Sequence, residues 1–208
     1  MNGFAHSAIG FGVGFAIAET SAASPFETVL LISAGSLSAL VPDLDINGKL
    51  TNRMTLPHQF LKTITTVAGC LIIYLTLTHV LQIEMWQGIG LGVALIGTAQ
   101  WISKRFMLSI TGMLIIAAGL FISKIWLTLF GAYVLIASFL SHRTYTHSLL
   151  GLGTFACIAW LFSRDMNMND LFFACSFGYA SHLLADMRWV PGNKKGIKLF
   201  LPLSKKSF

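Results

Sequence analysis

The sequence predicts an all-α protein, a polytopic transmembrane bundle of about eight helices, several of them short. The chain has 208 residues, of which 55% are hydrophobic and only 11% are charged, whereas charged residues make up about a quarter of an ordinary soluble domain. Its mean hydropathy is +0.73. Cys70, Cys157 and Cys175 lie inside apolar runs and form no CxxC pair, so we interpret them as small packing residues rather than as disulfides or metal ligands.

Apolar runs set the places of the predicted helices, because each run is long enough to cross or deeply enter a bilayer. The predicted helices cover residues 5–22, 26–41, 62–82, 87–103, 106–123, 125–140, 148–163 and 170–187. The first two and the last two are rich in Gly, Ala and Ser, which lets helices approach closely. We predict a membrane-embedded domain over residues 1–187 and a basic cytoplasmic or interfacial tail over residues 188–208.

A topology with one crossing per helix brings four polar stretches to the same face of the membrane. These stretches are the start of the first helix, the end of the second, the turn between the sixth and seventh, and the end of the eighth. All of the 14 Lys and Arg residues except Lys124 and Arg164 then lie on that face, and the positive-inside rule makes it cytoplasmic. Membrane orientation therefore explains the net charge of +6, and no nucleic-acid partner is expected.

The four stretches carry seven side chains of types that bind metal ions. They are His6, Asp43, Asp45, His142, His147, His182 and Asp186. The four-residue spacing of His182 and Asp186 places both on one helix face. Asp43 and Asp45 alternate with Leu44, and in an extended segment this alternation sends both carboxylates the same way. These spacings predict two pairs of ligands that each point in one direction.

His142 and His147 flank the turn into the next helix, so their imidazoles could converge from two sides of a pocket. Thr146 or the start of that helix is a candidate to fix their orientation. Each motif alone also has an ordinary explanation: a His and a capping Asp at a helix end, a polar loop, or interfacial histidines that reach water. The metal hypothesis rests on the occurrence of all of them at one depth, where ionisable groups are costly and usually functional.

Mixed His and Asp ligands are typical of Zn²⁺, Mn²⁺ or Fe²⁺, whereas Ca²⁺ and Mg²⁺ favour oxygen ligands alone. Seven ligands exceed the needs of one tetrahedral ion, so we predict two ions. Such a pair activates a bound water and holds both oxygens of an in-line displacement. Arg143 is the predicted catalytic residue, because it is placed to hold a phosphate oxygen or to stabilise transition-state charge. A role as an anchor at the cytoplasmic face remains the alternative for Arg143.

The early His, the PDLD segment, the HRTYTHS segment and the SHLLAD segment occur in an order that resembles a known family. It is the YdjM-like family of LexA-regulated, inner-membrane-associated proteins described as metal-dependent hydrolases. The resemblance implies metal-ligand roles for all seven residues of the set. It also implies a bacterial source.

We therefore predict a membrane-bound, metal-dependent hydrolase of the bacterial inner membrane, with its site and its C-terminus facing the cytoplasm. A site at headgroup depth favours an ester or phosphoester of a lipid-derived substrate. A metal-binding transporter or sensor without hydrolytic chemistry is the alternative. A transporter would need a polar path towards the far face, and the predicted helices between residues 62 and 140 carry almost no charge. A purely structural membrane protein is the third hypothesis.

Overall fold

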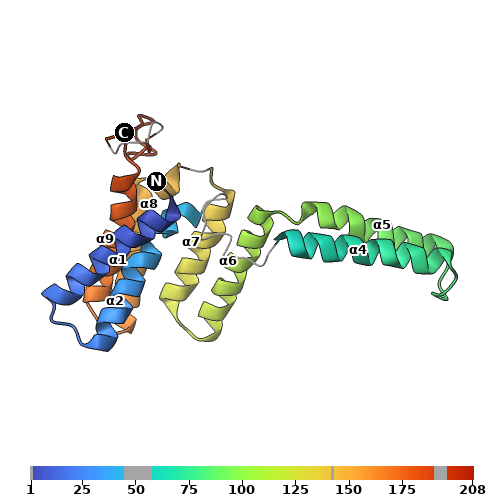
Figure 1. Cartoon of the computed structure of the whole chain (residues 1–208), viewed down its shortest axis with the longest axis horizontal. Coiled ribbons are helices and arrows are strands. Elements are labelled where there is room, and N and C mark those ends of the chain that lie inside the picture. The colour runs from blue at the N-terminus through green and yellow to red at the C-terminus, as the bar shows by residue number, and fades with distance from the viewer. Residues whose placement is uncertain (1, 45–57, 142, 190–195) are drawn as a thin grey trace.

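The computed structural model describes residues 2–44, 58–141, 143–189 and 196–208, and in these residues the chain is all-helical, without strands (Figure 1). Eight α-helices are present. They are α1 (Gly3–Thr20), α2 (Pro25–Ser38), α4 (His58–Leu77), α5 (Met85–Trp101), α6 (Lys104–Phe121), α7 (Ile125–Phe139), α8 (Leu149–Asp165) and α9 (Asp170–Ala185). Two short 3₁₀ helices, η1 (Val41–Leu44) and η2 (Tyr145–His147), lie between them. The eight predicted helices are thus confirmed as helices.

Local signals set the helix ends. The Ser24 side chain accepts a hydrogen bond from the Glu27 backbone, and the Glu27 side chain accepts one from the Ser24 backbone, which is a complete capping box for α2. The largest error in the predicted ends concerns α4, which ends at Leu77 although the apolar run continues to residue 82. His79 there has a φ of 55°, and the amide of Val80 bonds back to the carbonyl of Leu75. This left-handed turn ends the helix inside the apolar run.

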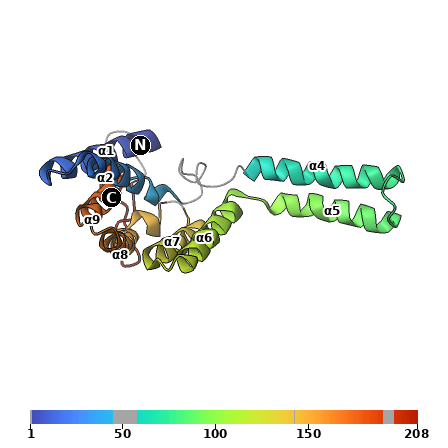
Figure 2. The ribbon, with the colours of Figure 1, turned by 90° about the horizontal axis from the view of Figure 1, so that it is seen from below.

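Six helices pack as one group, and two form a separate hairpin. Within the group α1, α2 and α9 contact one another, α8 packs between α9 and α7, and α6 packs on α7. The main partner of α4 is α5, and Figures 1 and 2 show that this hairpin extends away from the group. Of the described helices, α4 and α6 are long and apolar enough to cross a membrane, while α5 and α7 are apolar but shorter.

Three glycines allow α1, α2 and α9 to approach closely. A Cβ added at Gly10 would lie 2.4 Å from the carbonyl oxygen of Gly35, and one added at Gly178 would lie 2.5 Å from that same oxygen. Backbone atoms stand where a side chain would have to go, so these contacts require glycine. The predicted close packing is thus confirmed for α1, α2 and α9.

The predicted convergence of the polar stretches is also seen. The start of α1, the end of α2, the connection from α7 to α8 and the end of α9 meet at one end of the six-helix group. At the opposite end Asp165 accepts hydrogen bonds from Lys124, at 2.6 Å, and from the indole of Trp126, at 3.0 Å. The helices therefore place the candidate ligands at one end and this ion pair at the other.

The described part of the tail folds against the end of the group that carries the candidate ligands. Ile197 and Phe208 exchange two backbone hydrogen bonds, and the carbonyl of Leu199 accepts one from the amide of Leu149 at the start of α8. The Ile197 side chain is buried in the main apolar core beside Met187. The position of the tail relative to a membrane remains a prediction.

Candidate metal centre

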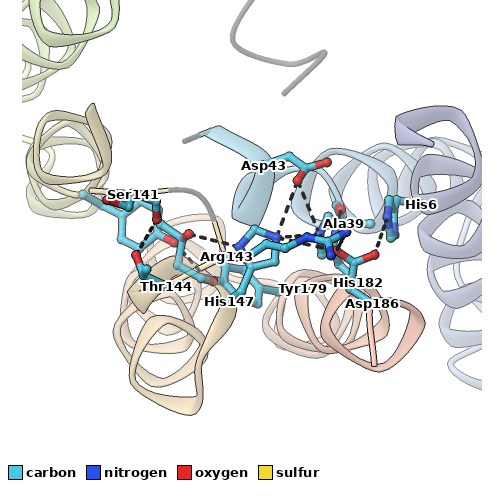
Figure 3. Close-up of polar contacts among 12 residues, drawn as sticks. His6, Ala39, Asp43, Ser141, Arg143, Thr144, His147, Tyr179, His182 and Asp186 are labelled. Atoms are coloured by element: carbon cyan, nitrogen blue, oxygen red, sulfur yellow. Dashed lines mark hydrogen bonds and ion pairs between the residues drawn. The ribbon is translucent and has the colours of Figure 1, made fainter. Parts of the chain in front are cut away.

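Five of the seven predicted ligands lie together at the end of the six-helix group (Figure 3). His6 comes from α1, Asp43 from η1, His147 from η2, and His182 and Asp186 from the end of α9. The three histidines and Asp186 are almost completely buried, and the Asp43 side chain is 17% exposed. Asp45 and His142 lie outside the described residues.

The centre is built around two imidazole nitrogens that face each other. The Nε2 atoms of His147 and His182 are 3.2 Å apart. Oδ1 of Asp43 lies 3.5 Å from the first and 3.7 Å from the second. Oδ2 of Asp186 lies 3.8 Å from each. The ligand atoms that all lie within 4.8 Å of one another form two groups that share His182: His6, Asp43 and His182 in one, and His147, His182 and Asp186 in the other.

These spacings fit a metal ion. Bonds of about 2.0–2.2 Å from Zn²⁺ to nitrogen and oxygen in a tetrahedron separate the ligand atoms by about 3.3–3.6 Å. The separations between the two imidazole nitrogens and from each of them to the carboxylate oxygens, 3.2 to 3.8 Å, lie close to this range. The donor set of two imidazoles and two carboxylates suits Zn²⁺, Mn²⁺ or Fe²⁺. Each of the two groups, with two imidazoles and one carboxylate, could therefore supply three ligands to one such ion.

Hydrogen bonding fixes the tautomer of His182 in the form that binds metal. Its Nδ1 lies 2.7 Å from the carbonyl oxygen of Ala39. A carbonyl oxygen only accepts, so Nδ1 carries the proton and Nε2 presents its lone pair to the centre. Ala39 follows the last residue of α2, where carbonyls have no partner within the helix. A bond of this kind outside the ligand set is what orients ligating histidines in metalloproteins.

A second chain of hydrogen bonds supports His147. The Thr146 hydroxyl lies 3.1 Å from Nδ1 of His147, and the Thr146 backbone carbonyl accepts a short hydrogen bond from the Tyr179 hydroxyl. The Tyr133 hydroxyl lies 2.8 Å from that of Tyr179. Ser148 bonds both to the Tyr145 carbonyl and to the Gly151 amide, so it closes η2 and begins α8. Thr146 and Ser148 therefore help to build the turn that carries His147.

His6 lies at the edge of the centre. Its ring stacks on that of His182 with centroids 3.8 Å apart, and its Nε2 is 3.4 Å from Oδ1 of Asp186. Asp186 thus faces His6 with one oxygen and the His147–His182 pair with the other. The Nδ1 atom of His6 is buried and has no hydrogen-bond partner within the described residues. If two ions were bound, the two oxygens of Asp186 would be available to both, and the second ion stays a prediction.

Arg143 lies beside the centre. Its guanidinium nitrogen Nη2 is 3.6 Å from Oδ2 of Asp186, and its side chain is 24% exposed. Its φ is 60°, a conformation uncommon for residues other than glycine. The connection between α7 and α8 thus holds a cation beside the carboxylate of Asp186. The catalytic role itself remains a prediction.

Electrostatics favours the ionised form of Asp43. Burial raises the pKa of its carboxyl, but the hydrogen bond to His147 and the positive charges that His182, His147 and His6 carry when protonated outweigh burial and lower the pKa below its usual value. Asp43 is therefore a carboxylate at neutral pH, which is the form that binds metal.

Replacing Tyr179 by Phe is expected to weaken metal binding by about tenfold, because the Thr146 carbonyl loses its donor and the turn that orients His147 loosens. Tyr133→Phe is the matched control. It keeps the Tyr179–Thr146 bond and should have a clearly smaller effect. Competition of each purified variant with a chelator of known affinity measures the difference. Equal affinities for Tyr179→Phe and the wild type would contradict the proposed support.

Sequence reasoning missed two of the supporting groups. The Ala39 carbonyl belongs to the backbone, which carries no residue-type signal. Tyr179 lies three residues before His182 in a helix otherwise rich in Gly, Ala and apolar residues, and this spacing, which puts both on one face, was a usable signal.

Comparison with families of known proteins matches residues 1–208 to the YdjM inner membrane protein family. The match covers the whole chain, so the chain belongs to this family and the resemblance inferred from its motifs is confirmed. Searches of curated proteins and of solved structures gave no match.

Proposed function

We propose that this member of an inner membrane protein family is a polytopic, metal-dependent hydrolase that cleaves an ester or phosphoester of a lipid-derived substrate. The observation that carries the proposal is the pair of buried Nε2 atoms of His147 and His182, 3.2 Å apart, with carboxylates of Asp43 and Asp186 on either side. Burying four such groups is costly unless they are paired or hold a metal. Metal binding gives the cluster a function that justifies this cost.

The proposed membrane arrangement is supported by the outer surfaces of the helices. Large apolar side chains stand more than half exposed on α4, α6 and α7, among them Val67, Leu114 and Ile136. Extended apolar surface of this kind marks contact with lipid or another protein. We propose that these surfaces face the bilayer and that the metal centre lies at its cytoplasmic boundary.

In the proposed reaction, a bound metal supplies an activated water and polarises the scissile group. The oxygen of water adds to the carbonyl carbon or phosphorus, the bond to the alcohol oxygen breaks, and the alcohol leaves with a proton. Asp43, His147, His182 and Asp186 hold the metal. Arg143 lies beside Asp186 with its side chain partly exposed, and in the proposed reaction it receives an anionic group of the substrate and stabilises developing negative charge.

The number of ions also belongs to the proposal. The described donors provide two groups of three ligands that share His182, with His6 on the second oxygen of Asp186. A second ion would take His6 as one ligand. Asp45 and His142 are the remaining candidates among the predicted ligands.

Hydrolysis by protein loaded in turn with Zn²⁺, Mn²⁺ or Fe²⁺ tests the proposal, with phospholipids, isoprenoid phosphates and carboxylic esters as substrates. His182→Ala and Asp186→Ala are each expected to reduce turnover to the background. Asp165→Ala is the matched control, because it removes a carboxylate at the opposite end and should leave turnover intact. Activity retained in both ligand variants would overturn the proposal. Metal accumulation in proteoliposomes without hydrolysis would support a transporter instead.

The orientation gives a separate prediction. In a chain without its native cysteines, Lys205→Cys in the tail should react with a membrane-impermeant maleimide only in inside-out vesicles. Ser21→Cys, in the connection from α1 to α2 at the opposite end of the group, should react only in right-side-out vesicles. The reverse pattern would place the metal centre outside the cytoplasm and contradict the assignment from the positive-inside rule.

A further inference from the structure

A groove of about 620 Å³ runs between α7 and α8. Its walls include Leu129 and Ile136 from α7, Leu140 directly after α7, and Leu150, Thr154 and Cys157 from α8. The lining is almost entirely apolar, and the volume falls in the range typical of sites for small molecules. The groove therefore suits a hydrocarbon ligand rather than a polar one.

One end of the groove coincides with the turn that carries the metal centre. Tyr145 and Thr146 line the groove, and both belong to η2, whose last residue is His147. The Thr146 hydroxyl lies within hydrogen-bond distance of Nδ1 of His147, and the Thr146 carbonyl accepts a hydrogen bond from the Tyr179 hydroxyl. The groove and the centre thus share one wall and meet at the connection from α7 to α8.

Hydrogen bonds connect the polar groups of the wall that the groove shares with the metal centre. Tyr133 also lines the groove, and its hydroxyl bonds to that of Tyr179. The hydroxyl of Tyr179 bonds in turn to the Thr146 carbonyl. These bonds join the groove-lining Tyr133 and Thr146 through Tyr179. A ligand in the groove would reach the centre over the rim, past Tyr145, where Arg143 lies close by in the chain.

We infer that this groove holds one hydrocarbon chain of an anionic, phosphate-bearing amphiphile, while its head lies at the rim beside Arg143 and the metal centre. This inference rests on the proposed function, because it names the class of substrate for the same site. Arg143 precedes the groove-lining Tyr145 by two residues and lies 3.6 Å from Asp186, so an amphiphile whose chain fills the groove can place an anionic head near this cation. Neutral polar solutes meet no complement in the groove.

The test uses hexadecyl phosphate that carries a photoactivatable diazirine near the end of its chain. The metal-loaded full chain is labelled in detergent, and the labelled positions are identified by mass spectrometry of peptides. Labelling of α7 and α8 along the groove, Cys157 included, is expected to saturate with probe concentration. Labelling of the exposed apolar faces of α4 and α6 should rise without saturation.

Ala132→Trp fills the groove, because Ala132 is one of its lining residues. It should lower the saturable labelling by at least about tenfold, equivalent to about 1.4 kcal/mol of binding. Ala117→Trp is the matched control, since Ala117 is exposed on α6 and lines none of the groove, and it should label like the wild type. The metal content of both variants should equal that of the wild type, which shows that each is folded at its centre.

Two outcomes overturn the inference: labelling that is equally unsaturated on the groove and on α4 and α6, or labelling that Ala132→Trp leaves unchanged. Failure of the proposed hydrolase can be told apart from failure of the groove inference. A wild type that labels saturably in the groove but hydrolyses no ester would refute the proposed hydrolase and support the groove as a lipid site. Hydrolysis of long-chain substrates that Ala132→Trp does not impair would support the hydrolase and overturn the groove.

Discussion

Replacement of Asp43 and His182 together by Ala is expected to remove the bound metal from the purified protein. The two residues supply an oxygen and a nitrogen, 3.7 Å apart, of the set of four donors. A site with only two of its ligands left cannot compete with buffer for a divalent ion. Elemental analysis of the wild type after reconstitution with Zn²⁺, Mn²⁺ or Fe²⁺ should give one or two equivalents, and the double variant close to none.

The matched control for this experiment is Asp165→Ala combined with His79→Ala. It removes the same two residue types, an Asp at the opposite end of the six-helix group and an exposed His beyond the end of α4, and should retain the full metal content. Two equivalents in the wild type would bear out the prediction of two ions, and one would limit the centre to the four donors. A wild type that binds none of the three ions would remove the basis of the proposed hydrolase.

The sequence predicted the parts of the centre that follow from local spacing and from the order of the helices. His182 and Asp186 share a face because they are four residues apart in a helix. Counting helices was enough to bring His6, Asp43 and His147 to the same end as this pair. These predictions needed only the helical period and the number of helices between the motifs.

The distances between residues of different helices could not be predicted from the sequence in this way. The contact of His182 with the Ala39 carbonyl depends on the packing of α9 against α2, and neither residue indicates the other. The same holds for Asp43 and His147, which come from η1 and η2. Packing decides such contacts, and packing is a property of the whole fold.

The arrangement of the apolar helices was likewise only partly predictable. The sequence predicted one bundle of about eight helices, whereas the structure has six helices in one group and α4 with α5 as a hairpin that extends from it. Both helices of the hairpin are apolar around much of their circumference, with Tyr74 and Val93 among the exposed residues. Without a polar face, the sequence does not show which side a neighbour covers.

The glycine contact among α1, α2 and α9 gives the second large expected effect. Gly35→Ala would place a Cβ 2.4 Å from the carbonyl oxygen of Gly10 and 3.1 Å from the amide nitrogen of Gly14. Because both neighbours are backbone atoms, the helices themselves must move apart, which costs about 1–3 kcal/mol. Thermal unfolding in detergent should show the lower stability of this variant.

Gly12→Ala is the control for this change, because no heavy atom lies within 4 Å of the Cβ it would add. It replaces a glycine in the interior of the same helix as Gly10 and should leave stability unchanged or slightly higher. If Gly35→Ala and Gly12→Ala unfold at the same temperature, the close contact of the three helices is not required for stability.

The glycine contact should also affect metal binding, because it lies one helical turn from the centre. Gly10 follows His6 by four residues, Gly35 precedes Ala39 by four, and Gly178 precedes His182 by four, so each pair is about 6 Å apart along its helix. Helices forced apart at the glycines would carry the His182 ring away from the Ala39 carbonyl, 2.7 Å distant, and release its tautomer. Gly35→Ala should therefore weaken metal affinity by about tenfold even though it changes no ligand. A variant that loses stability but keeps full affinity would show that the centre is held by its own hydrogen bonds alone.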